Sequence, residues 1–210
     1  MQNEHGTESK PLLRIGDVAP DFSARTTTGD ITLSQYRGKW LVFFSHPADF
    51  TPVCTTEFVA LAKATDKFAA LDCEILGLSV DSLFSHIAWM RAIREAFGIT
   101  INFPVIEDPS MAVGRAFGMI DETSQDSAAI RSTYFIDPEG VIRAITTYPH
   151  NVGRSVKEML RIVAALQCAA GDKVLTPEGW QPGDDVLLPP ATASGDDADA
   201  DWFCKRIAAP

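Results

Sequence analysis

Residues 41–57 read LVFFSHPADFTPVCTTE, and this stretch decides how the chain folds around one cysteine. The apolar run LVFFS has the length and composition of a buried strand. A loop that contains Pro47 follows, and Thr51 and Pro52 then mark the start of a helix. Threonine is a good N-cap, and proline has no N–H to leave unsatisfied at the first helical position. The stretch therefore predicts strand, tight loop and helix, with Cys54 in the first helical turn.

The position of Cys54 predicts a nucleophilic sulfur. In the first turn of a helix, unpaired backbone N–H groups and the positive end of the helix dipole favour an anion. The thiolate is the reactive form of cysteine, and a helix N-terminus makes it easier to form than in a free cysteine. We therefore expect Cys54 to react as a thiolate.

Strand and helix patterns alternate along the rest of the chain. The expected strands are residues 41–45, 74–80, 103–106, 131–136 and 141–148, and the expected helices are 52–70, 83–97, 111–117 and 156–166, after a short hairpin within 22–33. Such alternation is typical of an α/β core with the sheet in the middle.

The composition of the sequence changes after Gln167. Several prolines and the acidic, small-residue run ATASGDDADAD replace the alternating pattern. We therefore expect residues 1–167 to form one domain and residues 168–210 to form a C-terminal extension that wraps or pairs.

Composition excludes several classes of function. The chain has 210 residues, 18 of them basic and 28 acidic, for a formal charge of −10. An acidic chain without a cluster of Lys and Arg is a poor candidate for binding nucleic acid or an anionic membrane. The N-terminal MQNEHGTESK contains no apolar signal segment, and no apolar run approaches the roughly 18 residues of a membrane span. These features predict a soluble cytoplasmic protein.

The four cysteines are Cys54, Cys73, Cys168 and Cys204, and none of them forms a C-x-x-C pair. The cysteines and histidines lack the paired spacings of zinc sites, so we expect no metal. No phosphate-binding loop or dinucleotide fingerprint occurs either, which predicts no cofactor and a thiol as reductant. Cys73 and Cys168 are expected to be small packing residues, because free cysteine is often buried.

The run P-x-x-x-T-x-x-C, spelled by Pro47, Thr51 and Cys54, resembles the active-site signature of the peroxiredoxins, thiol peroxidases that reduce hydroperoxides. His46 before the proline and the full string PADFTPVCTTE resemble the 1-Cys, peroxiredoxin-6-like branch of bacterial or archaeal type. Further segments agree in the family's order: GDVAPDF (16–22), SVDS (79–82), FPVIEDP (103–109), RSTYFIDPEG (131–140), YPHNVGRS (148–155) and WQPGDDV (180–186). The resemblance covers nearly the whole chain and implies a thioredoxin-like fold, a central mixed sheet flanked by helices, with an extended C-terminal arm.

The resemblance also implies roles for four residues. Cys54 would attack the hydroperoxide and become a sulfenic acid. Thr51 would hydrogen-bond the bound peroxide, and Pro47 would shape the loop and shield the thiolate from water. Arg131, which begins RSTYFIDPEG, would hold the thiolate and stabilise the developing oxyanion, since a guanidinium is always charged and offers several donors.

Three further residues have supporting roles by the same resemblance. His46 either aids the handling of thiolate or peroxide or is simply hydrogen-bonded at the end of a strand. Glu57 is expected to fix the loop or Arg131 through hydrogen bonds. Arg154, in the stretch NVGRS, matches a second arginine that reinforces the site.

Regeneration of Cys54 has two alternatives. Cys204, in DWFCKR, resembles a cysteine that archaeal members of this branch carry in a WFC motif, and it would act as a resolving thiol from the arm of a partner subunit. In a 1-Cys cycle, thioredoxin, glutathione or another small thiol would reduce Cys54 instead. Relatives commonly form homodimers, and some assemble into rings of five dimers, so a dimer is expected and a decamer is the alternative.

Two rival functions belong to other classes. A thiol–disulfide oxidoreductase could use the same fold, but the absence of C-x-x-C argues against it. A non-enzymatic binding or chaperone-like assembly would use Cys54 only as a sensor. The sequence favours a thiol peroxidase that serves antioxidant defence and redox homeostasis.

Overall fold

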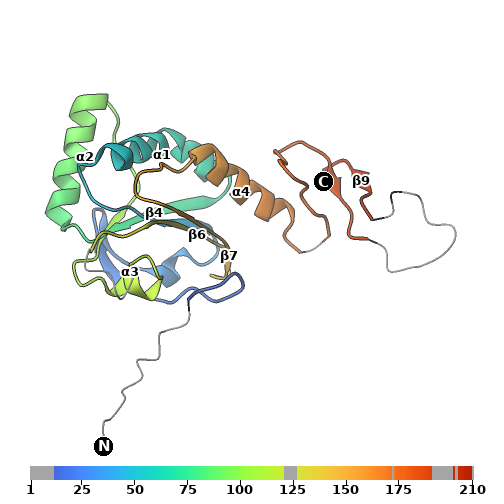
Figure 1. The fold of residues 1–210 in the computed structure, drawn as a ribbon, viewed down its shortest axis with the longest axis horizontal. Coiled ribbons are helices and arrows are strands. Elements are labelled where there is room, and N and C mark those ends of the chain that lie inside the picture. Colours follow the sequence, from blue (N-terminus) through green and yellow to red (C-terminus); the bar gives the residue numbers. More distant parts are fainter. Residues whose placement is uncertain (1–11, 121–126, 172, 191–200, 202, 210) are drawn as a thin grey trace, which may run out of the picture.

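A seven-stranded mixed sheet forms the centre of the molecule in this computed structural model, which describes residues 12–120, 127–171, 173–190, 201 and 203–209 (Figure 1). The spatial order of the strands is β2-β1-β5-β4-β3-β6-β7. Their bounds are β1 Ser23–Thr26, β2 Gly29–Thr32, β3 Trp40–Ser45, β4 Cys73–Ser79, β5 Val105–Glu107, β6 Arg131–Ile136 and β7 Ile142–Tyr148. β3, β4 and β5 are parallel neighbours, and the other pairs in the sheet are antiparallel.

Helices cover both faces of this sheet (Figure 1). They are α1 (Pro52–Ala70), α2 (Leu83–Phe97), α3 (Ala112–Ala116) and α4 (Val156–Cys168), and a short 3-10 helix, η1, spans Leu33–Tyr36. α1, α2 and α4 pack on one face through a cluster that includes Phe58, Trp89 and Met159. α3, η1 and the segment before β1 cover the other face.

Strand β3 is buried on both faces because its side chains alternate. Val42 and Phe44 point to the face of α1, whereas Leu41 and Phe43 point to the opposite face, and all four are at most 1% exposed. β3 ends at Ser45, which pairs with Leu78 of the parallel strand β4. The loop that leads to Cys54 therefore starts in the middle of the sheet, at the carboxyl ends of two parallel strands.

The expected α/β architecture with a central mixed sheet is confirmed. The hairpin expected within 22–33 is β1–β2, and Gly29 has the positive φ, +119°, that its turn requires. The helix expected over 111–117 is shorter, because Met111 and Phe117 are its non-helical caps.

The chain beyond α4 forms an arm that extends away from the sheet (Figure 1). Strands β8 (Val186–Leu187) and β9 (Arg206–Ile207) pair antiparallel within it. Trp180 is 4% exposed, packs in a small cluster with Ala164 of α4, and donates its indole N–H to the carbonyl of Asp184 at 3.1 Å. The arm thus packs against the end of α4 through a small apolar cluster.

Replacing Phe43 with alanine should destabilise the fold strongly. Phe43 is 0% exposed, and its ring centroid lies 4.9 Å from that of Phe117. Loss of this side chain should lower the free energy of unfolding by about 3–5 kcal/mol, as measured by urea denaturation. Phe97→Ala is the control, because Phe97 is 58% exposed, and it should change stability by less than about 0.5 kcal/mol. Similar losses in both variants would contradict the assignment of the core.

Candidate functional site

Cys54 is the third residue of α1, as the sequence predicted, and it is 0% exposed. Thr51 is the N-cap with extended backbone angles, and Pro52 is the first helical residue. The hydroxyl of Thr51 makes no capping bond to the helix; it donates to the carbonyl oxygen of Ala48 at 2.9 Å and so closes the loop. Phe50 in this loop has a positive φ of 56°, which is uncommon for a bulky side chain. The loop is thus held in a specific, strained path just before the sulfur.

Arg131 brings a positive charge to the sulfur. It is the first residue of β6, next to β3 in the sheet, and it is 2% exposed. Its Nη1 lies 3.3 Å from Sγ of Cys54. Its Nε and Nη2 donate to the carbonyl oxygen of His150 at 3.0 and 2.9 Å, which fixes the plane of the guanidinium.

Glu57 lies one helical turn after Cys54 and holds two arginines. Oε2 accepts from Nη1 of Arg131 and from Nη2 of Arg154, each at 2.8 Å, and Oε1 accepts from the backbone N–H and Nε of Arg154 at 2.7 and 3.0 Å. Burial alone would raise the pKa of Glu57, but the hydrogen bonds and charge of Arg154, with the charge of Arg131, hold that pKa below its ordinary value. Glu57 is therefore an ionised carboxylate inside the protein.

Arg154 connects the loop before α4 to the sheet. Its Nη1 donates to the carbonyl of Ser132 at 2.9 Å and to Oγ1 of Thr133 at 3.1 Å. The guanidinium also lies 5.0 Å from the centroid of the Phe44 ring, a cation–π distance. Arg154 is 7% exposed, so both arginines of the site are buried.

His46 and Pro47 line the other side of the loop, and both are buried. Nε2 of His46 lies 3.0 Å from Oδ1 of Asp49, and its ring centroid is 4.8 Å from that of Phe58. Burial lowers the pKa of His46, and the carboxylate of Asp49 only partly opposes this effect. The structure thus gives His46 a hydrogen-bond partner that the sequence analysis did not identify.

Two neighbours of His46 were not identified in the sequence analysis. Asp49 lies in the same loop, and His86 of α2 places Nδ1 2.8 Å from its Oδ2. His86 is the buried residue that precedes Trp89 and Ile93 by three and seven positions. This helical spacing could have revealed that His86 faces the core, although it does not reveal the partner.

His46, Asp49 and His86 also form the cluster of possible metal ligands in the part of the chain that is described. Their ligand atoms lie within 4.8 Å of one another. The nitrogen–oxygen separations, 2.8 to 3.1 Å, are ordinary hydrogen-bond distances, so protons account for each contact. The expectation that the protein uses no metal stays a prediction.

The structure does not bring Cys204 to Cys54 within one chain. α1 and α4 both begin at the site, and Gln167 near the end of α4 donates to the carbonyl of Leu71 at the end of α1. The 19 residues of α1 span about 28 Å, so the arm starts far from the sulfur. Cys204 is exposed in this arm.

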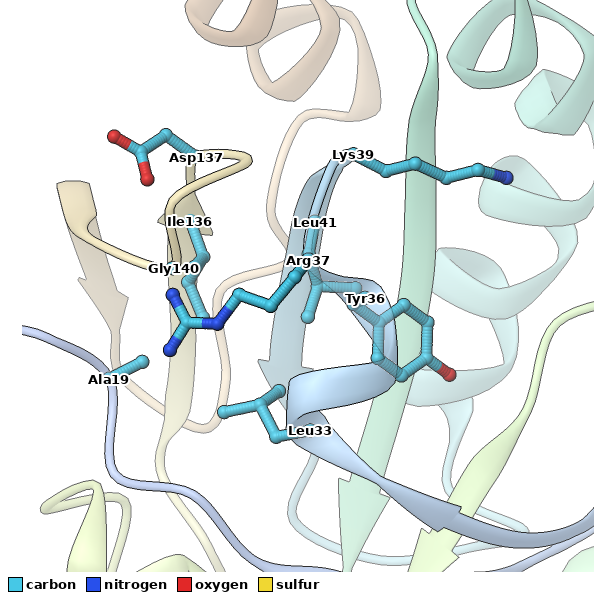
Figure 2. A pocket seen from close by; sticks show the side chains of 9 residues that line it. All are labelled: Ala19, Leu33, Tyr36, Arg37, Lys39, Leu41, Ile136, Asp137 and Gly140. Carbon is cyan, nitrogen blue, oxygen red and sulfur yellow. The ribbon is translucent and has the colours of Figure 1, made fainter.

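A hollow at the opposite end of β3 does not belong to the site. Figure 2 shows Arg37 reaching across it toward Gly140, with Lys39 and Tyr36 nearby. Its cavity volume of about 10 Å³ is room for one water at most. β3 begins beside this hollow, whereas Cys54 follows the far end of the strand.

Comparisons with known proteins place the chain in a family. The AhpC/TSA family model matches residues 15–145, and the model for the C-terminal domain of 1-Cys peroxiredoxin matches residues 165–199. A peroxiredoxin of Methanosarcina mazei is 48% identical over 85% of this chain and 85% of its own, and one of Aquifex aeolicus is 43% identical over 93% and 97%. The structure of a yeast mitochondrial 1-Cys peroxiredoxin superposes with a TM-score of 0.84 at 37% identity, covering 94% of this chain and all of the other. The C45S mutant of peroxiredoxin 6 from Arenicola marina gives 0.84 at 28% identity, over 94% and 99%. These likenesses confirm the thioredoxin-like architecture.

Replacing Glu57 with glutamine should change the pH dependence of stability. The pKa of Glu57 is lowered in the folded state, so its ionised form stabilises the fold above the ordinary pKa of about 4.3, and this contribution is lost as the pH falls through the lower folded value. At pH 7, Glu57→Gln should therefore lower the free energy of unfolding by about 3 kcal/mol. The gap between the two proteins should narrow as the pH falls below about 4.3, as measured by urea denaturation.

Glu95→Gln is the control for this measurement, since Glu95 is exposed on α2. Its free energy of unfolding should equal that of the unmodified protein at each pH. If the difference in free energy of unfolding between Glu57→Gln and the unmodified protein stays constant down to pH values near 3, the buried carboxylate is not ionised as described.

Proposed function

The chain belongs to the peroxiredoxin family and is a thiol-dependent peroxidase, and on this premise we propose that Cys54 is the sulfur that attacks the hydroperoxide. The other buried thiol, Cys73, is a poor nucleophile because burial raises its pKa to about 12. Cys168 and Cys204 lie at the end of α4 and in the arm, away from both arginines of the site.

The observation that carries this proposal is the guanidinium of Arg131 against the sulfur. Arg131 and Arg154 bring two positive charges into the interior, and Glu57 balances only one of them. Buried charge is costly without a partner, so an anion at Cys54, 3.3 Å from Nη1 of Arg131, completes the balance. This charge count favours the thiolate that peroxide reduction needs.

The reaction follows from this arrangement. The thiolate of Cys54 attacks the nearer oxygen of the hydroperoxide, the S–O bond forms and the O–O bond breaks. The departing oxygen takes a proton and leaves as water or an alcohol, and Cys54 becomes a sulfenic acid. The donors of Arg131 stabilise the negative charge as it moves.

Thr51, Pro47 and His46 form the rest of the proposed peroxide site. Because the hydroxyl of Thr51 already donates to Ala48, it can meet one of the two O–H groups of hydrogen peroxide as an acceptor. Pro47 keeps water from the sulfur. The complete burial of Cys54 favours hydrogen peroxide and small organic hydroperoxides as substrates.

The role of Arg131 is tested by Arg131→Lys, which keeps a charge but loses the fixed fork of donors. We expect the second-order rate constant for hydrogen peroxide to fall about a hundredfold, and Cys54→Ser should remove peroxide consumption while circular dichroism shows an intact fold. Arg143→Lys is the control, since Arg143 lies on β7 and pairs with Asp137 at 2.5 Å. Equal rate constants in the Arg131 and Arg143 variants would refute the proposed role.

Regeneration needs a second thiol, and we propose that it comes from outside the Cys54 chain. One route is an external reductant such as thioredoxin, glutathione or another small thiol; the work on the yeast mitochondrial 1-Cys protein concerns thiol resolution through glutathione and thioredoxin systems. The other route is Cys204 of a second copy, because the arm of one chain extends away from the sheet beyond the end of α4 (Figure 1), whereas Cys54 lies at the start of α1. The second route requires a homodimer, and a decamer of five dimers is the larger alternative.

The arm is central to this second route. We propose that residues 168–210 act as a dimerisation arm on a peroxidase domain of residues 1–167. We also propose that the protein works in the cytoplasm in antioxidant defence, since the four unpaired cysteines fit a reducing compartment. No helix in the described part of the chain combines the length and the apolar character needed to cross a bilayer.

The two routes give different products with one equivalent of hydrogen peroxide. If Cys204 resolves Cys54, non-reducing electrophoresis and intact mass will show a covalent dimer, which Cys204→Ser abolishes and Cys73→Ser leaves in place. A monomer that carries one added oxygen, in the unmodified protein and in Cys204→Ser alike, would assign regeneration to an external thiol.

A further inference from the structure

His46, Asp49 and His86 form a buried cluster that the peroxidase mechanism above uses only in part. They come from the loop after β3 and from α2, and each is at most 7% exposed. The carboxylate of Asp49 lies between the two rings, 3.0 Å from Nε2 of His46 and 2.8 Å from Nδ1 of His86. We call these three residues the His46–Asp49–His86 cluster.

The protons on His86 can be assigned from its two partners. Nε2 lies 3.1 Å from the carbonyl oxygen of Ile106, and a carbonyl only accepts, so Nε2 carries a proton. Nδ1 faces the carboxylate of Asp49, which also needs a proton between the two atoms. Burial alone would raise the pKa of Asp49, but its hydrogen bonds to His46 and His86 hold that pKa far below its ordinary range. The His86–Asp49 pair therefore holds two protons, one on Nε2 of His86 and one between Nδ1 and the carboxylate, and it is neutral overall.

This pairing decides the state of His46. Nε2 of His46 donates to Oδ1 of Asp49, whose charge His86 already neutralises, so His46 needs no second proton. Its Nδ1 is buried and has no hydrogen-bond partner among the residues that the structure describes. An unpaired buried polar atom is uncommon and calls for a ligand or another explanation.

His46 lies against α1, the helix that carries Cys54. The ring of His46 contacts Phe58, one helical turn after Cys54, and side chains on a helix lean toward its N-terminus. His46 therefore lines the same end of α1 as the sulfur.

The charged side chains around His46 in the described part of the chain already have other hydrogen-bond partners. Asp81, after β4, is occupied by the backbone N–H of Asp49 and the hydroxyl of Ser79. On α1, Glu57 is occupied by two arginines, and Arg131 of β6 is tied to Glu57 and the carbonyl of His150. The remaining titratable group of that helix turn is Cys54 itself.

We propose that His86 is a positioning residue of the peroxidase site, which acts through Asp49 to keep His46 neutral with Nδ1 free to accept the O–H of a hydroperoxide bound at Cys54. This inference rests on the proposed role of His46 in peroxide handling. His86 does not touch the substrate; it sets the proton on a residue that does.

The proton assignment is tested without peroxide by nitrogen-15 NMR of histidine-labelled, reduced protein, which has only four histidines. Between pH 6 and 8 we expect His86 to carry protons on both nitrogens and His46 to carry one, on Nε2. In His86→Gln, Asp49 lacks its cation, so His46 should gain a proton on Nδ1 at pH 6. In Asp49→Asn, His86 should become neutral while His46 keeps its single proton, because asparagine can accept from one ring and donate to the other.

A proton on Nδ1 of His46 in the unmodified protein, or an unchanged His46 in His86→Gln, would overturn the proposal. This result would leave the assignment of Cys54 intact, since it does not depend on catalysis. Conversely, if the spectra are as expected but Cys54 does not react with hydrogen peroxide, the proposed function is refuted while the proton assignment stands.

The kinetic test uses charge compensation. The rate constant of His86→Gln for hydrogen peroxide, relative to that of the unmodified protein, should fall about tenfold between pH 8 and pH 6, because protonated Nδ1 cannot accept a hydrogen bond. Asp49→Asn in the same chain removes the uncompensated charge and should restore most of the rate at pH 6. If the double variant is as slow as His86→Gln, His86 only packs α2 against the loop, and the proposal fails. Circular dichroism at each pH confirms that the compared variants are folded.

Discussion

The carboxylate of Glu57 is the interaction on which the site depends. Two guanidinium groups are buried beside Cys54, and neither would be stable there without a counter-charge. Glu57 accepts three hydrogen bonds from these guanidinium groups and a fourth from the backbone N–H of Arg154, and it lies on the same helix as the sulfur, one turn away. The helix that positions Cys54 therefore also positions Arg131, so nucleophile and donor form one rigid unit.

In the mechanism that we propose, the arginine side of the site and the His46–Asp49–His86 cluster are chemically complementary. The arginine side supplies donors and one positive charge in excess, which suits a thiolate and a departing oxyanion. The His46–Asp49–His86 cluster is neutral overall and presents one bare nitrogen, which suits an O–H group. A hydroperoxide has an O–H group and an oxygen on which charge develops, so the proposed site would recognise its two ends differently.

Much of this arrangement could be predicted from the sequence. The apolar run before Ser45 and the Thr51–Pro52 pair locate strand β3, the start of α1 and the helical position of Cys54, because these are local signals. The order of the strands could not be derived in this way: β1 pairs with β5, far along the chain, and periodicity carries no information on such pairings. The resemblance supplied the thioredoxin-like fold instead.

The candidate site residues could likewise be predicted only in part from the sequence. The resemblance pointed to Arg131, Glu57 and Arg154, but their shared carboxylate joins positions 74 and 97 residues apart, which spacing cannot show. Asp49 and His86 were missed because their contact joins positions 37 residues apart, which spacing cannot show. The hydroxyl of Thr51 donates to Ala48 and accepts no hydrogen bond from the first turn of the helix, because the loop before α1 turns back on itself.

The central claim is that Glu57 holds Arg131 at the sulfur, and the most direct measurement is the rate of Cys54 oxidation in Glu57→Gln. Stopped-flow kinetics with hydrogen peroxide should give a second-order rate constant about a hundredfold below that of the unmodified protein, with native circular dichroism. A folded Glu57→Gln protein that reacts at the full rate would show that Arg131 reaches the sulfur without this carboxylate, and the account would be wrong.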